Sequence, residues 1–270
     1  LVPSRGLGDV YKRQQSDHVV DKQSELDVNL ESIQRFRDAG LFVFWIVDGS
    51  FQSAVRRHGL MSVFSMIAKS PEVLASEFKA TSDLVMASMN QGVEAGALGI
   101  ILADDIAYSH STYMSPDFIE RYLQPVWKAQ TARANKLGVP VFFHSDGNLN
   151  TVLPHIIAAG FDGLQCIEPA AGMDIIKISA RYGQSLCLMG GIDPALLVHN
   201  ENLCDMETAQ NNLRRTITTL MDSDLTRGGF ILGSCSGLYE GMSPELVHSM
   251  YQLISQCNCG HGPAPDFSSV

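Results

Sequence analysis

Short apolar runs alternate with longer amphipathic stretches along most of the chain. The apolar runs predict six β-strands, at residues 41–48, 98–104, 139–144, 163–168, 185–190 and 229–234. These runs are apolar almost throughout, as expected for strands of a parallel sheet that is covered on both faces. The pattern therefore predicts an α/β protein.

Helical patterns lie between the predicted strands, at residues 71–94, 116–137, 149–159, 174–182, 206–222 and 244–255. Several of them begin with proline, which the first helical turn tolerates, and many end at a glycine. Six β/α units in series, without a linker, predict one domain: a TIM (β/α)8 barrel that lacks its first units. An open doubly wound sheet is the alternative. The barrel is favoured because polar residues follow almost every strand and because no GxGxxG or GxxxxGK[ST] phosphate loop occurs.

The two ends of the chain differ from the rest. Residues 4–14 read SRGLGDVYKRQ, which resembles a translated sequencing-library adapter, so residues 1–14 are interpreted as an artefact. The alternative is a natural polar arm. The barrel domain is then expected over residues 15–256, as part of a longer protein. Residues 257–270, with Cys257, Cys259 and His261, predict a flexible tail rather than a metal site.

Composition narrows the function classes. The chain has 270 residues and a net charge of −10, and it contains no basic run, which argues against a nucleic-acid partner. No apolar run approaches the ~20 residues that cross a bilayer, so no membrane partner is expected. The six cysteines lack the regular spacing of a disulfide framework, which favours a cytoplasmic protein. We therefore expect a soluble, globular, cytoplasmic protein.

Polar residues gather where the predicted strands end, which is where barrel enzymes carry their chemistry. Asp104 and Asp105 form a candidate acid/base pair, although one of two adjacent acids often only caps a loop. Tyr108 is predicted to bind substrate or to pack, and Glu168 is the functional candidate of its strand. Cys166, beside it, is interpreted as a small buried residue. Asp193 and Ser236 are predicted to contact a cofactor or substrate.

The segment His144-Ser145-Asp146 offers a candidate metal site. Residues two apart on a strand share a face, so His144 and Asp146 are expected to point into the mouth of the barrel. Together with Cys235 they would supply three zinc ligands of a catalytic type. In the alternative interpretation, His144 only forms a hydrogen bond and Asp146 caps the helix that begins near Leu149.

Several segments together resemble the uroporphyrinogen decarboxylase superfamily. They are VPVFFHSDGN (139–148), AGFD (159–162), GGIDP (190–194), GLYEGMSPE (237–245) and the YMSPDFIERYLQPV run (113–126). The resemblance spans roughly residues 44–254 and implies a TIM barrel. It implies either a cofactor-free decarboxylase of uroporphyrinogen III or a zinc-dependent methyltransferase that moves methyl groups between a corrinoid protein and a thiol.

The charges at the strand ends separate these two branches. The decarboxylase substrate carries eight carboxylates and requires basic residues, whereas the strand-end loops contain no Lys or Arg besides Arg56 and Arg57. The methyltransferase branch implies a His-x-Cys pair and a later Cys. His144 matches the histidine and Cys235 approximates the later cysteine, but Asp146 replaces the first cysteine. In this position the sequence departs from the methyltransferase pattern.

The leading hypothesis is a methyltransferase-like enzyme that holds zinc through His144, Asp146 and Cys235, with Asp104, Asp105 and Glu168 orienting the substrate. Its substrate would be a thiol and its partner a corrinoid protein. The first alternative is uroporphyrinogen III decarboxylase, a cofactor-free enzyme of porphyrin biosynthesis, in which Tyr108 or Asp104 assists with a tetrapyrrole. The second is a barrel that only binds a small ligand or a corrinoid protein.

Overall fold

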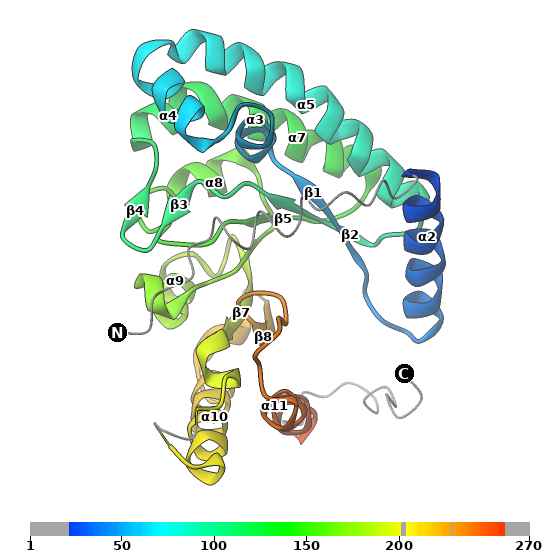
Figure 1. Cartoon of the computed structure of the whole chain (residues 1–270), viewed down its shortest axis with the longest axis vertical. Helices are drawn as coiled ribbons and strands as arrows, with labels where there is room; N and C mark the ends of the chain where they lie inside the picture. The colour runs from blue at the N-terminus through cyan, green and yellow to red at the C-terminus, as the bar shows by residue number, and fades with distance from the viewer. Residues whose placement is uncertain (1–21, 201–203, 228, 257–270) are drawn as a thin grey trace. The chain divides into compact units, whose positions relative to one another are not determined.

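The computed structural model describes residues 22–200, 204–227 and 229–256 (Figure 1). The predicted adapter-derived residues 1–14 and the tail cysteines lie outside these ranges. The chain divides into two compact units, of which the first ends at Leu41 and the second begins at Phe42. The described part of the first unit is helix α2 (Lys22–Asp38). It ends in a turn in which Gly40 has a φ of 75° and the N–H of Leu41 bonds the carbonyl of Phe36.

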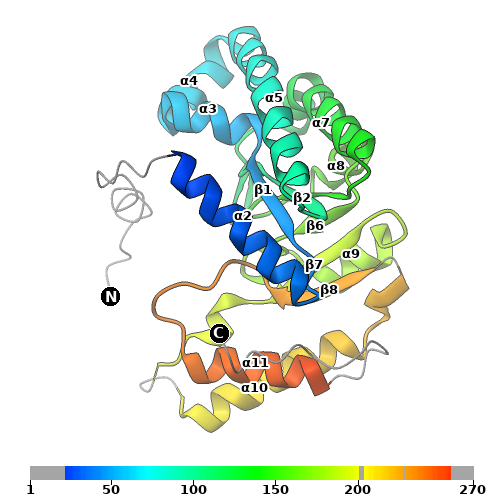
Figure 2. The same ribbon diagram turned by 90° about the vertical axis from the view of Figure 1, so that its right-hand side faces the viewer.

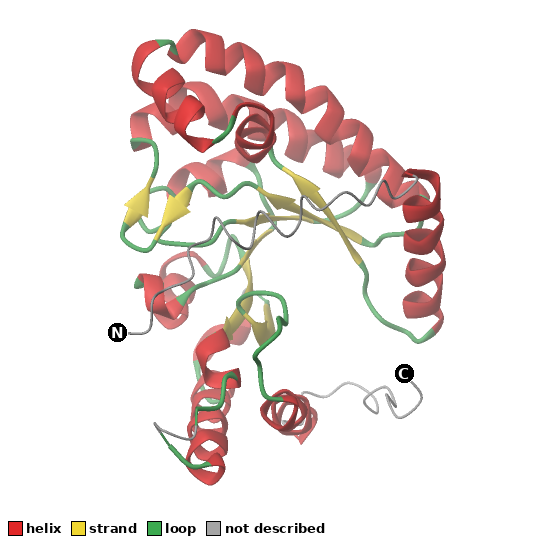
Figure 3. Ribbon diagram, viewed as in Figure 1, coloured by secondary structure: helices red, strands yellow, loops and turns green. Residues whose placement is uncertain are grey.

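The second unit is built on a six-stranded parallel sheet (Figure 3). Its strands are β1 (Phe44–Asp48), β2 (Gly99–Ala103), β5 (Val141–His144), β6 (Gly163–Gln165), β7 (Cys187–Ile192) and β8 (Phe230–Ser234). Each predicted strand is confirmed to within three residues at either end. Neighbours in the sheet follow one another along the chain, whereas a doubly wound sheet reverses its order at a switch point. The barrel-type order is thus confirmed.

Helices connect the parallel strands, as the amphipathic patterns predict. The main ones are α5 (Pro71–Glu94), α7 (Gln124–Leu137), α8 (Leu153–Ala159), α9 (Ile175–Tyr182), α10 (Met206–Met221) and α11 (Pro244–Gln256). Helix α5 packs against α7, and α10 packs against α11 (Figures 1 and 2). None of the helices in the described ranges is both long and apolar enough to span a membrane.

Several elements differ from the prediction. The expected helix 116–137 is divided into α6 (Pro116–Phe118), a π-helical stretch (Ile119–Leu123) and α7, since Pro125 has no N–H to donate to the helix. Helix α8 begins four residues later than expected. The pattern missed α3 (Ser50–His58), α4 (Leu60–Lys69), and the hairpin of β3 (Ala107–Tyr108) and β4 (Ser111–Thr112).

Aromatic side chains fill the layer between the sheet and α7. Trp127 on α7 meets Phe143 of β5 edge-on, with ring centroids 5.0 Å apart, and Phe143 meets Phe161 in the same way at 5.1 Å. All three are buried, and such edge-to-face pairs stabilise a core beyond the area that they bury. Phe143 directly precedes His144, so this packing supports the carboxyl end of β5, where a predicted site residue lies.

Candidate active site

One row of residues crosses the sheet at the carboxyl ends of its strands. Asp48, Ala103, His144, Gln165 and Met189 are register partners on β1, β2, β5, β6 and β7. Register partners in a parallel sheet share a face, so His144 and Gln165 point the same way. The row places polar side chains of three strands together.

His144 lies at the centre of this row and is held from both sides. Its Nδ1 is hydrogen-bonded to the side-chain oxygen of Gln165, and its Nε2 lies 3.6 Å from Oδ1 of Asp105. Because an amide oxygen only accepts hydrogen bonds, Nδ1 carries the proton and Nε2 is the basic atom of the neutral ring. Gln165 is in turn fixed by donating to the backbone oxygen of Cys235 at 3.3 Å.

The loops after β5 and β6 are joined at two points. The thiol of Cys166 donates to Oδ1 of Asp146 at 2.8 Å, and the N–H of Gly147 donates to Oε2 of Glu168 at 2.9 Å. Helix α8 begins at Leu153 with Val152 at its N-cap and no side-chain cap, so the interpretation of Asp146 as its cap is wrong. The hydrogen bond that the same interpretation expected of His144 is present. Glu168 lies at the site as predicted, but it binds backbone.

Carboxylates crowd around His144. Burial raises the pKa of Asp105, and the neighbouring Asp146 and Asp48 raise it further, whereas His144 lowers it. Asp48 forms an ion pair with Arg56, whose side chain is 59% exposed, and Arg57 pairs with Glu77 at 2.5 Å. The two arginines of this rim are thus already neutralised by protein carboxylates.

Asp104 lies beneath the site rather than in it. Its side chain is fully buried, and its oxygens accept from the backbone N–H of Gln52 and from Nε1 of Trp127, both at 2.9 Å. It thereby caps the amino end of α3, where Gly49 offers no side chain. Burial raises its pKa to about 7. The carboxyl predicted to act on substrate therefore ties β2 to α3 and α7.

Tyr108 stands on the β3–β4 hairpin beside the loop after β5. Gly147 has a φ of 87°, and a Cβ there would lie 2.6 Å from the carbonyl oxygen of Tyr108. That same carbonyl accepts from the N–H of Asn148 at 2.9 Å. Glycine is therefore required for the hairpin to approach the acidic loop so closely. The Tyr108 side chain is 45% exposed, so it is available to a ligand.

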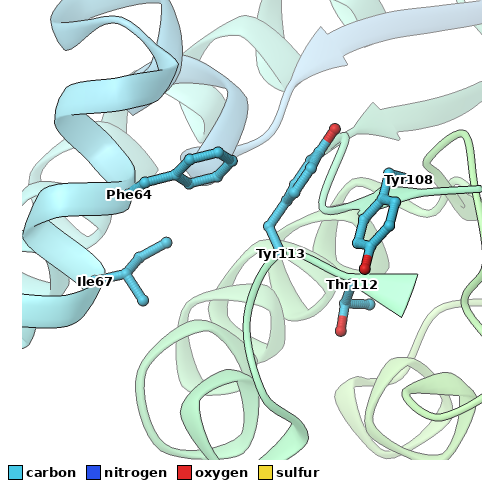
Figure 4. A pocket seen from close by; sticks show the side chains of 5 residues that line it. All are labelled: Phe64, Ile67, Tyr108, Thr112 and Tyr113. Atoms are coloured by element: carbon cyan, nitrogen blue, oxygen red, sulfur yellow. The ribbon is translucent and has the colours of Figure 1, made fainter. Parts of the chain in front are cut away.

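A cavity of about 280 Å³ opens between α4 and the hairpin, lined by Phe64, Ile67, Tyr108, Thr112 and Tyr113 (Figure 4). The rings of Tyr108 and Tyr113 are nearly parallel, at 21° and 5.7 Å between centroids. Phe64 is tilted by 49° to Tyr113 at 5.2 Å. In Figure 4, Phe64 and Ile67 from α4 face the three hairpin side chains across this space.

The three predicted zinc ligands do not converge. The thiol of Cys235 is buried and donates to the carbonyl of Ile167 at 2.9 Å, while Asp146 accepts from Cys166. Burial also raises the pKa of the Cys235 thiol to about 11, so the protonated thiol prevails near neutral pH. Within the described ranges, no three His, Cys, Asp or Glu side chains form a group that could hold a metal ion. The donor set therefore does not fit zinc.

The remaining predicted contacts have local partners. Asp193 caps the short helix Pro194–Leu197 by accepting from the N–H of Ala195 at 2.9 Å, and the hydroxyl of Ser236 bonds the carbonyl of Gly237 at 3.4 Å. Sequence reasoning missed Gln165 and the aromatic cavity. Gln165 is the one amide in the run GLQCIE, and its position opposite His144 follows only from the strand register.

Comparison with known proteins agrees with this architecture. The family model described as uroporphyrinogen decarboxylase (URO-D) matches residues 6–257. Uroporphyrinogen decarboxylase of Aromatoleum aromaticum is 25% identical over 78% of this chain and 54% of its own length. That of Nitrosomonas europaea is 25% identical over 62% of the chain and 44% of its own length. The chain thus spans about half the length of the curated relatives that it matches.

A solved structure shows the same fold. A methyltransferase from Methanosarcina mazei superposes with a TM-score of 0.66 at 19% identity, covering 84% of this chain and 63% of that one. At this identity the likeness establishes the fold, a TIM-barrel-type arrangement, and not the reaction. The family match extends over most of the chain and includes all six strands and the row of residues at their carboxyl ends. The chain belongs to the uroporphyrinogen decarboxylase (URO-D) family.

Proposed function

We propose that this chain is an enzyme of the methyltransferase type within its family, and that it moves a methyl group to the sulfur of a small thiol. The observation that carries the proposal is the charge around His144. Asp105, Asp146 and Glu168 bring three carboxylates to the site, whereas Asp48 and Arg56 neutralise each other. Such a mouth repels a substrate with many carboxylates and accepts a neutral or cationic one.

His144 would take the proton of the thiol. Its Nε2 is the basic atom of the ring, and Asp105 at 3.6 Å stabilises the imidazolium that forms. The bond that forms joins the methyl carbon to sulfur, the bond that breaks joins the methyl group to its donor, and the thiol proton passes to His144. No step here uses zinc, because the donors do not fit that ion.

The methyl donor belongs to the proposal as well. A methylated corrinoid presented by a partner protein is the donor that family membership suggests. Decarboxylation of uroporphyrinogen is the competing function, and the names of the curated relatives favour it. The two functions require opposite charges at the mouth, so one set of assays separates them.

The test supplies methylcobalamin together with three thiols of matched size: cysteamine, 2-mercaptoethanol and 2-mercaptoethanesulfonate. We expect thioether formation, measured by mass spectrometry, to be fastest with the cationic thiol and slowest with the anionic one. His144→Ala should lower the rate about 10²-fold to 10⁴-fold, the usual contribution of a general base. A rate that follows the opposite order of charge, or loss of CO2 from uroporphyrinogen III without any thioether, would overturn the proposal.

A further inference from the structure

The aromatic cavity between α4 and the hairpin has no role in the chemistry proposed for His144. Its volume of about 280 Å³ lies just below the range for ligand sites, which begins near 300 Å³. It therefore suits one chemical group of a substrate rather than a large molecule. Three of its five lining side chains are aromatic: Phe64, Tyr108 and Tyr113.

The lining is uncharged but electron-rich. The faces of aromatic rings carry partial negative charge. A tyrosine ring therefore attracts a cation, whereas an aliphatic side chain of the same size does not. The hydroxyl of Thr112 donates to the carbonyl of Met114 at 2.6 Å, so its proton points away from a ligand. Ile67 completes the wall with an apolar surface that suits alkyl groups.

The charge of the surroundings selects among possible occupants. The backbone of Tyr108 lies against Gly147. Asp146 precedes Gly147 in the chain, and the carboxylate of Glu168 accepts a hydrogen bond from the Gly147 N–H. Asp105 lies three residues before Tyr108 on the same strand connection. None of these carboxylates lines the cavity. A cation there would gain from the aromatic rings, and the negative charge of the adjoining loop would oppose an anion.

We propose that this cavity binds an alkylated ammonium group, such as a trimethylammonium head, and that substrates of this enzyme carry such a group. Four alkyl substituents fill an apolar space without requiring hydrogen bonds, and the positive charge meets the aromatic rings that line the cavity. The proposal deepens the proposed methyl transfer by naming the class of substrate. Its test measures binding alone, so failure of the methyl-transfer assay does not decide it.

The test compares choline with 3,3-dimethylbutan-1-ol, which has the same shape but carries no charge. Isothermal titration calorimetry of the whole chain should show choline binding at least about fivefold more tightly, the effect of about 1 kcal/mol from one or two cation–π contacts. Equal affinity for the two compounds would mean a merely apolar cavity, and absence of choline binding would mean no such site. Either outcome overturns the proposal.

Variants locate the binding. Tyr108→Leu should abolish the preference for choline, whereas Tyr108→Phe, which keeps the ring, should retain most of it. Tyr251→Leu on α11 is the matched control, because Tyr251 is exposed to a similar degree, 52%, and does not line the cavity. The assignment would be contradicted if Tyr251→Leu lost choline binding. It would also be contradicted if a folded Tyr108→Leu protein bound choline as well as wild type does.

Discussion

His144 donates its Nδ1–H to the side-chain oxygen of Gln165, its register partner on the next strand. The first prediction concerns this pair. Gln165→Leu removes the acceptor and frees the imidazole to rotate, so methyl transfer should fall about 10²-fold, as misplaced catalytic groups do. The reduction should appear in kcat, with KM for the thiol little changed.

Gln165→Glu provides the matched control, because a carboxylate also accepts from Nδ1. Gln165→Glu should retain more activity than Gln165→Leu, and the two variants should unfold at the same urea concentration. Equal activity of the two variants would show that the hydrogen bond does not orient His144.

The second prediction concerns the pKa of Asp105. Burial raises this pKa and the nearby His144 lowers it, so His144→Ala should raise it further. The carboxyl carbon shift in a ¹³C NMR titration reports the change directly. His110→Ala removes an exposed histidine that meets the ring of Tyr108 and should leave the titration unchanged. A lower pKa in His144→Ala would contradict the arrangement.

The third prediction concerns the pH dependence of stability. The pKa of Asp104 is about 7 in the folded protein against an ordinary value of 3.8, so between these values the folded protein holds a proton that the unfolded chain releases. This group therefore makes wild-type stability fall as pH rises from about 4 to 7, and it contributes no slope above 7.

Asp104→Asn removes that slope, so urea unfolding of wild type and variant should differ in pH dependence between pH 5 and 8. The two oxygens of Asp104 accept hydrogen bonds from Gln52 and Trp127, whereas the NH2 group of an asparagine cannot accept one. The free energy of unfolding of the variant should therefore also be lower by about 1–3 kcal/mol at low pH. Parallel stability curves would show that Asp104 stays ionised over the whole range.

The fourth prediction concerns the contact between Gly147 and the hairpin. Both Gly147 and Gly138 have positive φ, 87° and 73°, but a Cβ at Gly138 meets no atom within 4 Å. Gly138→Ala should cost about 1 kcal/mol from its backbone conformation alone. Gly147→Ala should cost at least about 1 kcal/mol more, because it also overlaps Tyr108. Equal unfolding free energies of the two variants would exclude a tight contact.

The fold was largely predictable, because each strand of the six-stranded sheet is a short run of apolar residues. Residues 98–104 became β2, which is buried almost throughout, and residues 229–234 became β8, which is only partly buried. Helices α3 and α4 were missed although both are amphipathic, because neither begins with a side-chain cap of its own. Helix α3 begins without a capping side chain of its own, and its cap, Asp104, is 52 residues away from Gln52.

The site was only partly predictable, because it depends on contacts between residues that lie far apart in the sequence. The sequence placed Asp105, His144, Asp146 and Glu168 at strand ends, and the structure brings these together. It could not show that Asp104 turns inward, or that Cys235 meets Ile167 instead of His144. Such outcomes depend on register and on loop backbone, and these are long-range properties of the chain.

The two ties between the loops after β5 and β6 have a mechanical consequence. Asp146 is joined to Cys166, and Gly147 to Glu168, so neither loop can shift without drawing the other along. Cys166 is the one non-glycine residue in the described ranges with a positive φ, 67°. A ligand that displaces one of these loops must therefore displace the other as well.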